Sequence, residues 1–233
     1  MKRIVVLTGA GMSAESGIST FRDSGGLWDT YRVEDVATPE GWARDPQKVT
    51  DFYNIRRREL QTVEPCRGHR LLAELERDYE VDIITQNVDN LHERAGSRRV
   101  LHLHGELMKV TSSLQPNNPL YIEELTEGRT EVRIGDLAKD GSQLRPFIVW
   151  FGEAVPQIER AAELSAQADI FLIIGTSLNV YPAAGLTRFV PEGCPIYLID
   201  PKPVQWNSNR PFTHIQKGAS EGMEDFADML RHA

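Results

Sequence analysis

Short apolar runs alternate with amphipathic stretches along most of this chain. The runs that are rich enough in β-branched residues to form strands span residues 4–7, 81–85, 148–151, 170–174 and 196–199. Each run is apolar at nearly every position, which is typical of parallel strands covered by helices on both faces. From Ser220 onward Met223, Phe226 and Leu230 share one helical face. The alternation predicts an α/β fold, a Rossmann-like doubly wound parallel sheet with a smaller inserted domain.

Two polar, turn-rich regions interrupt this rhythm and suggest the insertion. Residues 24–63 lack a strand pattern and contain a helix-like run over residues 47–60, and residues 108–146 are polar and rich in turn-forming residues. We interpret both regions as parts of one smaller domain. The predicted main domain is formed by residues 1–23, 64–107 and 147–233, and the predicted inserted domain is formed by residues 24–63 and 108–146.

Length, charge and cysteine content narrow the class of protein. The chain has 233 residues and a net charge of −8, which argues against non-specific binding to nucleic acid and against a basic face for membrane surfaces. No stretch has the apolar length that a membrane span needs, and the run after Met1 is too short for a signal peptide. Because Cys66 and Cys194 are the only cysteines, no disulfide framework is expected. These features predict a cytoplasmic enzyme or binding protein.

A glycine-rich segment directly follows the first apolar run. Gly9, Gly11 and Ala14 fit the pattern G-x-G-x-x-G/A. In that pattern glycines allow a tight turn and a close approach to a diphosphate, and a helix N-terminus offers amide donors. The alternative is a tight strand–helix turn that needs small residues. The acidic residue that usually holds the ribose about 20 positions further on is missing, which weakens the interpretation as an ordinary dehydrogenase.

Polar residues follow the second apolar run. Gln86, Asn87 and Asp89 come at the carboxyl end of the run over residues 81–85, where open α/β sheets bind ligands. Amide and carboxylate groups at this edge can hold a ribose, a carboxamide or a water molecule. The alternative is helix capping, because Asn and Asp are good N-caps. For Asp89 taken alone, the two interpretations are equally supported.

Two histidines follow in a short strand-like segment. Strand alternation places His102 and His104 on one face, with His104 at the strand end beside Gly105. There His104 can reach a cleft and act as a base near neutral pH, whereas His102 is interpreted as a hydrogen-bonded core residue. No further ligands stand at a spacing useful for a metal, so no metal site is expected.

Several separate motifs resemble the sirtuins and occur in the sirtuin order. They are Gly9 to Ile18, Thr20-Phe21-Arg22, Thr85 to Asp89, His104-Gly105, Phe151-Gly152-Glu153 and Gly175-Thr176-Ser177. The resemblance covers nearly the whole chain and is more specific than the glycine pattern alone. It looks closest to bacterial sirtuins of the desuccinylase-like class, and it implies an NAD-dependent enzyme that removes acyl groups from the lysines of proteins or peptides.

The resemblance also implies a mechanism that consumes NAD. The acyl-lysine oxygen is expected to attack the ribose carbon that bears nicotinamide; nicotinamide leaves, and the acyl group ends on ADP-ribose as O-acyl-ADP-ribose. His104 is then the expected general base on the ribose hydroxyls. Asn87 and Asp89 are expected to hold the ribose and nicotinamide, and Gln86 to hold the ribose near His104.

Further cofactor contacts are implied by the same resemblance. Phe21 is expected to shield the reacting face from the return of nicotinamide, and Arg22 to help close a cofactor loop. Asp200, at the end of a later strand, is expected to accept from the adenosine ribose hydroxyls. The other positions expected to line the dinucleotide site, besides the glycine-rich segment, are Ala10, Gly175, Thr176, Ser177 and Ala219.

A tyrosine and an arginine stand three positions apart in the helix-like run. Tyr53 and Arg56 therefore lie on one helix face, and a phenol beside a guanidinium makes a good receptor for a carboxylate. Sirtuins that remove succinyl and malonyl groups carry Tyr-x-x-Arg at the matching place. The resemblance thus implies that this chain removes those groups as well as acetyl groups. The alternative is that the arginines at positions 56–58 form a solvated helix face.

The peptide that carries the acyl-lysine is expected to bind between the two domains. Backbone pairing is the expected mode, because it tolerates many side chains. The segment expected to pair with the peptide spans residues 149–153, with residues 178–181 as a second candidate segment. Within the first segment, Val149, Phe151 and Gly152 are the expected substrate-binding residues.

The chain departs from the family in its smaller domain. Most sirtuins carry four zinc-binding cysteines there, but residues 110–144 contain none, so zinc is not expected. We hypothesise that an apolar mini-core holds this module instead, formed by Leu120, Ile122, Leu125, Val132, Ile134 and Leu137. Phe147 also stands where relatives often carry His, and it is expected to alter the wall near the peptide groove.

Three other functions compete with deacylation on this evidence. Mono-ADP-ribosyl transfer uses the same scaffold, but His104 and the Tyr53/Arg56 pair favour deacylation. A non-catalytic NAD-sensing module needs neither His104 nor Asn87. A hydride-transfer dehydrogenase is disfavoured because the ribose-binding acid is absent from its usual place.

Overall fold

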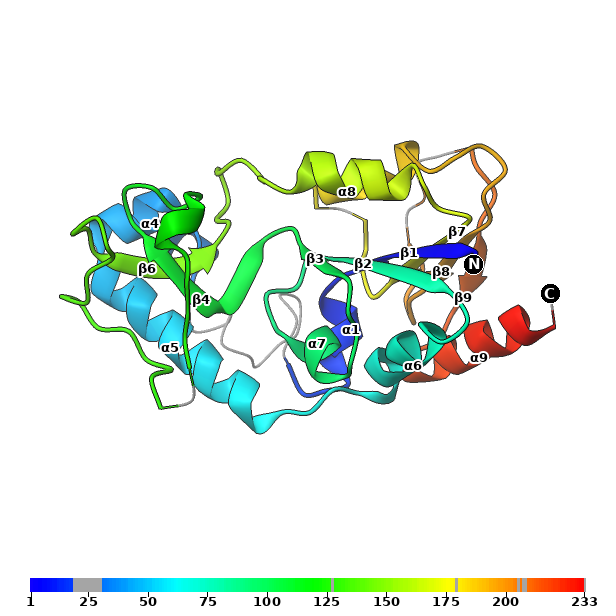
Figure 1. Cartoon of the computed structure of the whole chain (residues 1–233), viewed down its shortest axis with the longest axis horizontal. Coiled ribbons are helices and arrows are strands. Elements are labelled where there is room, and N and C mark those ends of the chain that lie inside the picture. Colours follow the sequence, from blue (N-terminus) through cyan, green and yellow to red (C-terminus); the bar gives the residue numbers. More distant parts are fainter. Residues whose placement is uncertain (19–30, 127, 179, 205, 207–208, 233) are drawn as a thin grey trace.

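The computed structural model describes residues 1–18, 31–126, 128–178, 180–204, 206 and 209–232. It contains a six-stranded sheet and a separate three-stranded sheet (Figure 1). The six strands of the larger sheet are all parallel. In chain order they are β1 (Arg3–Thr8), β2 (Glu80–Thr85), β3 (Val100–His102), β7 (Ile170–Ile174), β8 (Ile196–Ile199) and β9 (Thr213–Ile215).

The strand order confirms the predicted doubly wound fold. The sheet runs β3-β2-β1-β7-β8-β9, so the first strand is central and the chain winds outward from it in both directions. Four of the apolar runs predicted as strands of this sheet are confirmed, at residues 4–7, 81–85, 170–174 and 196–199. The edge strand β9 escaped prediction because it is only three residues long and only Ile215 in it is buried.

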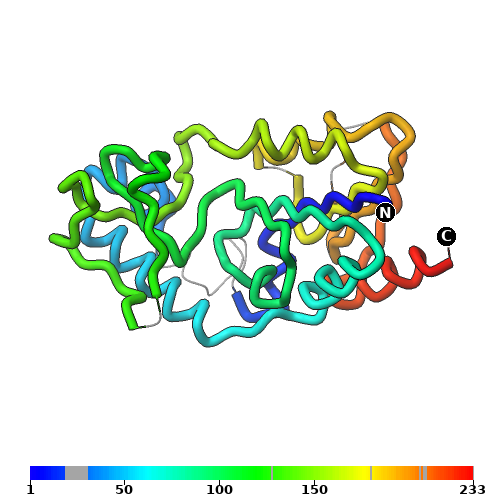
Figure 2. The backbone as a smooth tube through the Cα atoms, viewed as in Figure 1, coloured from blue at the N-terminus to red at the C-terminus, as the bar shows by residue number. Residues whose placement is uncertain are grey.

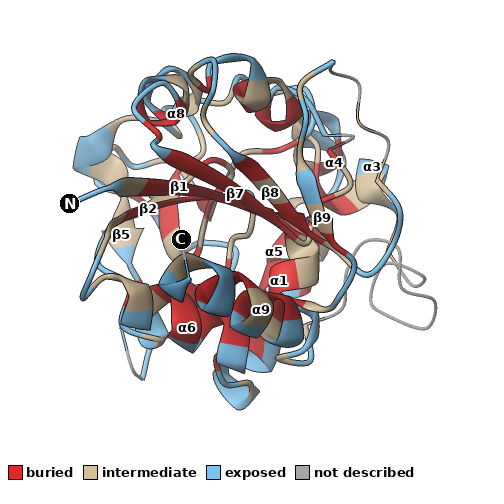
Figure 3. Cartoon of the chain, turned by 90° about the vertical axis from the view of Figure 1, so that its right-hand side faces the viewer, coloured by how far each residue is buried: buried red, intermediate tan, exposed pale blue. Residues whose placement is uncertain are grey.

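Helices cover both faces of the larger sheet (Figure 3). Successive residues of a strand point to opposite faces, so Ile4 and Val6 of β1 enter one core cluster while Val5 and Leu7 enter the other. The face with Ile4 packs against α1 (Ala10–Ala14), α6 (Arg67–Leu75) and α9 (Ala219–Arg231). The opposite face packs against α8 (Ile158–Ser165) and η2 (Ala183–Arg188), and the short α7 (Leu91–Arg94) follows β2.

The smaller sheet is antiparallel and has the order β5-β4-β6. Its strands are β4 (Gly105–Ser112), β5 (Glu123–Glu124) and β6 (Leu144–Ile148), with η1 (Pro119–Tyr121) before β5. Gly105 has a φ of 84°, and a Cβ there would lie 2.1 Å from the Phe147 carbonyl oxygen. Only glycine therefore allows β4 to start this close to β6.

The prediction that residues 148–151 form a strand of the parallel sheet is wrong. Ile148 ends β6 and pairs with Gly105 in the smaller sheet, and the residues after it belong to no strand. Ile148 and Trp150 are nevertheless buried, because they pack in a cluster with residues of α5 and with Leu107 of β4. The run is apolar because side chains of a helix and a strand cover it, rather than because it is paired in the larger sheet.

A long helix supports the smaller sheet. α5 (Pro46–Thr62) has a proline at its first position, and it is capped by Asp45, whose side chain accepts a hydrogen bond from the Lys48 amide. Val49, Phe52 and Tyr53 are buried on the side that faces the sheet. The shorter helices α3 (Val33–Val36) and α4 (Pro39–Arg44) precede α5 and pack beside it.

The predicted mini-core of the small module is only partly correct. Leu125 and Val132 are buried as expected, but Leu120 is 71% exposed and Leu137 is 60% exposed. Ile134 is also exposed. The residues that complete the buried cluster are Val110, Ala138 and Leu144. Val110 belongs to β4 and Leu144 to β6, so the paired strands contribute to this cluster along with the loop residues.

Hydrogen bonds stabilise the small module near Ser112, at the end of β4. The buried Ser112 hydroxyl donates to Asp140 at 2.6 Å and accepts from the amides of Leu114 and Gln115. Ser142 also donates to the Asp140 carboxylate, at 2.7 Å. Carboxylate and hydroxyl groups thus fasten the hairpin ends together. Among the described residues, no group of three His, Cys, Asp or Glu side chains is arranged to hold a metal ion.

The backbone passes between the two sheets more than once (Figure 2). After β1 and α1 it forms α3 to α5, returns for α6 to β3, leaves again for β4 to β6 and returns for β7. The domain bounds given above stay a prediction; the smaller sheet itself spans residues 105–148. In the described part of the chain, no helix combines the length and apolar character needed to cross a membrane.

Candidate active site

The candidate site residues gather at the carboxyl ends of four neighbouring strands. β3, β2, β1 and β7 are adjacent in the sheet, and the segments that follow them carry His104, Gln86, Gly9 and Gly175 respectively. The parallel arrangement places these segments at one edge, which is where open α/β sheets bind ligands. The structure therefore brings together the four motifs that the sequence had only placed in order.

The segments after β1 and β7 pass each other in close backbone contact at Gly9, Gly11 and Gly175, and we call this contact the glycine crossing. The Gly9 amide donates to the Ile174 carbonyl at 3.0 Å, and the Gly11 amide donates to the Gly175 carbonyl at 2.9 Å. A Cβ on Gly11 would lie 2.7 Å from Gly175 Cα, and a Cβ on Gly9 would lie 2.7 Å from Thr176 Cβ. Gly175 also has a φ of 62°. The backbone approach thus requires glycine, as the dinucleotide pattern does.

Gln86 and Asn87 are fastened to that crossing. Gln86 Nε2 donates to Thr176 Oγ1 at 3.2 Å. Asn87 Nδ2 donates to the Gly9 carbonyl and to Ser13 Oγ, both at 3.0 Å. The amide oxygen of Asn87 has no donor among the described residues. Because the donors of Asn87 are fixed within the chain, this oxygen is oriented and remains available to a hydroxyl or amide of a ligand.

Asp89 is buried and bonded within the chain. Its carboxylate accepts from Ser13 Oγ at 2.9 Å and from the Leu91 amide at 3.1 Å. Burial raises the pKa of Asp89 above its ordinary value, and the two hydrogen bonds oppose that shift. The bond to Leu91 supports the capping interpretation, while the shared Ser13 hydroxyl links Asp89 to Asn87. Ser13 is a member of this network that sequence reasoning did not single out.

His104 has the geometry of a base. Its Nδ1 lies 3.0 Å from the Gln86 carbonyl oxygen, and since a carbonyl can only accept, Nδ1 carries a proton. Nε2 of the neutral ring is then the acceptor. Burial lowers the pKa of His104 below its ordinary value, and the bond to Gln86 only partly offsets this. The ring is therefore neutral at pH 7 and able to take a proton.

His102 is held in a different way, which confirms that it is hydrogen-bonded rather than free. Its Nδ1 donates to the Asn87 carbonyl at 3.1 Å, and its Nε2 lies 2.8 Å from Glu93 Oε1. Burial lowers the pKa of His102, but the bond and charge of Glu93 outweigh it, so the net shift is upward. His102 is thus an ion-pair partner that supports the backbone of Asn87.

The His102–Glu93 pair predicts a pH-dependent stability. The raised pKa of His102 gives stability that is full below 6.5 and lost as pH rises through the folded value. The lowered pKa of Glu93 gives stability above 4.5 that is lost in acid. Glu93→Gln should therefore reduce the free energy of unfolding more near pH 6 than near pH 9, by about 1 kcal/mol because the Glu93 carboxylate is partly solvated.

Urea unfolding of both proteins at the two pH values measures this difference. Arg231→Gln is a suitable control, because Arg231 is exposed and pairs with Asp228 far from the site. An equal loss from Glu93→Gln at both pH values would show that His102 is not charged in the folded protein.

The remaining expected cofactor positions lie around this edge, with different exposure. Ala10 and Ala14 belong to α1, and Thr176 is buried and accepts from Leu178 as well as Gln86. Ser177 follows it, and Asp200 ends β8 with its carboxylate accepting from the Lys202 amide. Ala219 opens α9 and is buried in the core, so only its backbone could reach a ligand. Phe21 and Arg22 lie outside the described residues.

Tyr53 and Arg56 both belong to α5, and Arg56 lies near Asp89 of this edge. Tyr53 is buried, and Arg56 lines a cavity of about 150 Å³ together with Ile18, Val88 and Asp89. Glu59 approaches Arg56 only to 4.0 Å. The solvated-face alternative is wrong for Arg56 and Arg57, because Arg57 is 1% exposed and the side chain of Arg56 is also largely covered. It holds for the neighbouring arginine at position 58, which pairs with Glu131 at the surface.

The segment expected to bind the peptide is hydrogen-bonded to two other parts of the chain. The Val149 amide donates to the His104 carbonyl at 2.9 Å, and the Phe151 amide donates to the Ala37 carbonyl at 3.0 Å. Phe151 and Gly152 are exposed. Because both amides donate within the chain, pairing of Val149 or Phe151 with a peptide would use their carbonyls. The same segment contains Trp150, which sequence reasoning did not assign a role.

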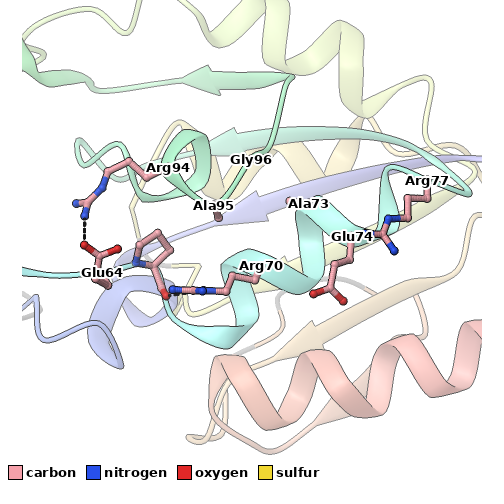
Figure 4. A pocket seen from close by; sticks show the side chains of 9 residues that line it. Glu64, Arg70, Ala73, Glu74, Arg77, Arg94, Ala95 and Gly96 are labelled. Atoms are coloured by element: carbon pink, nitrogen blue, oxygen red, sulfur yellow. Dashed lines mark hydrogen bonds and ion pairs between the residues drawn. The ribbon is translucent and has the colours of Figure 1, made fainter.

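A larger open cavity of about 540 Å³ lies away from these residues, between α6 and α7 (Figure 4). Arginines and glutamates line it in nearly equal number, and Arg94 pairs there with Glu64 at 2.8 Å. None of the site residues named above lines it. Size alone therefore does not identify the active site in this chain; the convergence of the strand ends does.

Known proteins are similar to this chain in sequence and in fold. A model of the Sir2 family matches residues 9–182. Proteins named NAD-dependent protein deacylase from Bacteroides thetaiotaomicron and Helicobacter pylori are 65% and 53% identical to this chain, each over 99% of this chain and 98% of the relative.

Solved structures give the same result. A Sir2 homologue in complex with NAD has a TM-score of 0.87 and 40% identity, over 99% of this chain and 90% of that one. A mutant Sir2 homologue in complex with ADP-ribose has a TM-score of 0.86 and 40% identity, over 99% and 92% of the two chains. The matched sequence runs from the glycine crossing at Gly9 through His104 to the segment after β7, and on these grounds the chain belongs to the Sir2 family.

Proposed function

We propose that this chain is an NAD-dependent protein lysine deacylase that removes succinyl and malonyl groups as well as acetyl groups, releasing nicotinamide and O-acyl-ADP-ribose. The observation that carries the acyl preference is the position of Arg56 in a cavity beside Asp89, on the same helix face as Tyr53. The names of its relatives support deacylation. The cytoplasm is its proposed location, which its two free cysteines support.

The residues at the strand ends fit NAD. A Cβ at positions 9, 11 or 175 would overlap the neighbouring segment of the chain, and Gly9 and Gly11 also fit the glycine pattern of turns that bind a diphosphate. When bound, NAD supplies a ribose carbon from which nicotinamide departs readily. Asn87 offers its free amide oxygen to the ribose or nicotinamide, and Asp89 and Gln86 orient groups beside it. Ala10, Thr176, Ser177 and Asp200 are proposed to line the rest of the cofactor site.

His104 is the proposed general base. Its Nδ1 proton is fixed on the Gln86 carbonyl, so Nε2 is the atom that takes the proton from a ribose hydroxyl. The His104 carbonyl in turn accepts from the Val149 amide. This bond links the base directly to the segment proposed to carry the peptide, and so fixes the base relative to the acyl-lysine.

Tyr53 and Arg56 are the proposed receptor for the carboxylate of the acyl group. Burial raises the pKa of Tyr53 to about 12, so the phenol is protonated at neutral pH and acts as a donor. Burial lowers the pKa of Arg56 below its ordinary value, but an arginine stays charged in proteins. A neutral donor and a cation together match the two oxygens of a carboxylate.

Excess positive charge surrounds this receptor. Arg57 is buried, donates to the Leu107 carbonyl and the Asn54 side chain, and has an Nη2 atom without a partner. Arg145 is also buried, although Glu153 balances it. The charges of Arg56, Arg57 and Arg145 all act on Tyr53. Because the buried Arg57 guanidinium carries an unsatisfied Nη2 atom, and an unsatisfied buried cation is costly, an anionic acyl group is a favourable neighbour here.

Replacement of Arg56 tests the proposal. We expect Arg56→Met to lower kcat/KM for a succinyl-lysine peptide by about 50-fold, because the truncation leaves a desolvated carboxylate without its cation. An acetyl group has no carboxylate, so kcat/KM for the matching acetyl-lysine peptide should change less than about threefold. Both rates are measured as nicotinamide-coupled acyl removal from one peptide sequence in its two acylated forms.

Arg58→Met is the matched control, since it removes the same side chain one position from Arg57 but at an exposed site paired with Glu131. Equal rates on both peptides in all three proteins would indicate a general deacetylase. Nicotinamide release without loss of either acyl group would favour mono-ADP-ribosyl transfer, and binding of NAD without any turnover would favour an NAD-sensing module.

The small module is proposed to fold without zinc. The apolar cluster around Val110 and Leu144 and the hydrogen bonds of Ser112 and Asp140 support this. No nucleic acid or membrane partner is proposed, in keeping with the net charge of −8.

A further inference from the structure

A chain of buried contacts leads from the smaller sheet to the hydroxyl of Tyr53. Trp150 Nε1 donates to Tyr53 Oη at 3.0 Å, and Trp150 is 2% exposed. The Arg145 guanidinium lies 3.4 Å from the centre of the Trp150 ring. Glu153 accepts from the Trp150 amide at 2.8 Å and from both Nη atoms of Arg145. The indole is therefore fixed at its backbone, on its face and at its nitrogen.

This arrangement has a consequence for the direction of the Tyr53 proton. A phenol oxygen can accept one hydrogen bond and donate another. The Trp150 N–H can only donate, so it occupies a lone pair and leaves the phenol proton pointing elsewhere. No acceptor for that proton lies among the described residues. A buried donor without an acceptor is costly, which indicates that a ligand supplies the acceptor.

The charges around Tyr53 indicate the chemistry of that ligand. The cations Arg56, Arg57 and Arg145 act on the phenol, and Arg57 Nη2 has no hydrogen-bond partner among the described residues. An anionic acceptor therefore suits the phenol proton better than a neutral one. The carboxylate of a succinyl or malonyl group meets this requirement, whereas an acetyl group carries no charged acceptor.

We infer that Trp150 is a positioning residue for anionic acyl groups: its indole N–H, held in place by Arg145 and Glu153, aims the Tyr53 hydroxyl at the carboxylate of the substrate. The inference rests on the proposed function, because it presumes that Tyr53 contacts the acyl group. It adds residues from a different segment of the chain, 97 positions away from Tyr53. Trp150 itself touches the tyrosine and not the substrate.

Trp150→Phe is the variant that tests the inference. It removes the N–H and keeps an aromatic ring for Arg145 and for Trp42, whose ring lies 5.8 Å away. We expect KM for the succinyl-lysine peptide to rise about fivefold to tenfold with kcat nearly unchanged, as for one misdirected hydrogen bond. The Kd of that peptide, measured by calorimetry without NAD, should rise by the same factor. Acetyl-lysine parameters should stay as in the wild type.

A double-mutant cycle with Tyr53→Phe separates positioning from mere packing. If Trp150 acts only through the phenol, Trp150→Phe has no further effect once the hydroxyl is gone. A packing defect instead adds to the loss and also affects the acetyl-lysine peptide. Trp42→Phe is the matched control, because it makes the same change in the neighbouring half-buried indole, which has no bond to Tyr53.

The outcomes distinguish this inference from the function on which it rests. Dependence of succinyl removal on Arg56 and Tyr53, with no change of KM or Kd in Trp150→Phe, overturns the positioning role and leaves the proposed function intact. Indifference of the wild type to the acyl group, with no effect of Arg56→Met, overturns both. Additive losses in the double mutant also overturn the positioning role.

Discussion

His104→Ala should lower kcat for acyl removal by about 1000-fold, the size expected for loss of a positioned general base. The imidazole Nε2 is the acceptor in the neutral ring, because Nδ1 donates to the Gln86 carbonyl. Alanine removes that acceptor and leaves the backbone bond from the Val149 amide to the carbonyl of residue 104 in place. The measurement is kcat on succinyl- and acetyl-lysine peptides, and both should fall alike.

A second reaction of the same variant serves as its control. Under the proposed mechanism His104 acts after nicotinamide has left, so exchange of labelled nicotinamide into NAD should survive the substitution. Loss of exchange together with acyl removal would point to a collapsed site. In the wild type, acyl removal should be independent of pH above about 7 and fall only in more acid solution, because burial lowers the pKa of His104 and the neutral ring is the active form.

Gly175→Ala should reduce the free energy of unfolding by about 4 kcal/mol, near the upper end for single substitutions. Two causes add. The φ of 62° strains any residue with a Cβ, and that Cβ would lie 2.3 Å from the Met12 nitrogen and 2.7 Å from Gly11 Cα. The contacts are backbone atoms, so a rotamer change cannot relieve them. Urea unfolding measures the loss, and the Kd for NAD should rise more than about tenfold.

Gly193→Ala isolates the strain from the overlap. Gly193 has a φ of 83°, but no heavy atom lies within 4 Å of the Cβ that the substitution adds. This variant should lose only about 1 kcal/mol and bind NAD as the wild type does. Equal losses from the two variants would show that the glycine crossing is not tightly packed.

The larger sheet could be predicted because most of its strands can be recognised from their own local sequence. β1, β2, β7 and β8 are rich in apolar residues and buried at nearly every position. The same rule misassigned residues 148–151, since local pattern cannot tell whether strands or a helix cover an apolar run. The prediction for the small module failed at Leu120, Ile134 and Leu137, which lie outside β4 and β6 and are exposed, because apolar character alone does not show whether a loop residue faces the core.

The candidate site was also predictable only in part: its local motifs could be found from sequence, but the contacts between distant segments could not. Its cofactor residues form short motifs, so their positions could be found from sequence, and the parallel sheet then brings the motifs together. The contacts that orient side chains join distant segments and have no local signature. The hydrogen bond from Trp150 to Tyr53 and that from Gln86 to Thr176 each span some ninety positions of sequence. Ser13 belongs to the site because it bonds with Asn87 and Asp89, which are also distant in sequence.

The central position of the first strand bears on how the protein is made. β1 leaves the ribosome long before its neighbour β7, which begins only at Ile170. At synthesis rates of about 5–20 residues per second, one edge of β1 stays unpaired for roughly 10–30 seconds. During that time an apolar edge is open to other nascent chains. We therefore expect chaperone capacity and growth temperature to govern the soluble yield of the protein more strongly than its folded stability does.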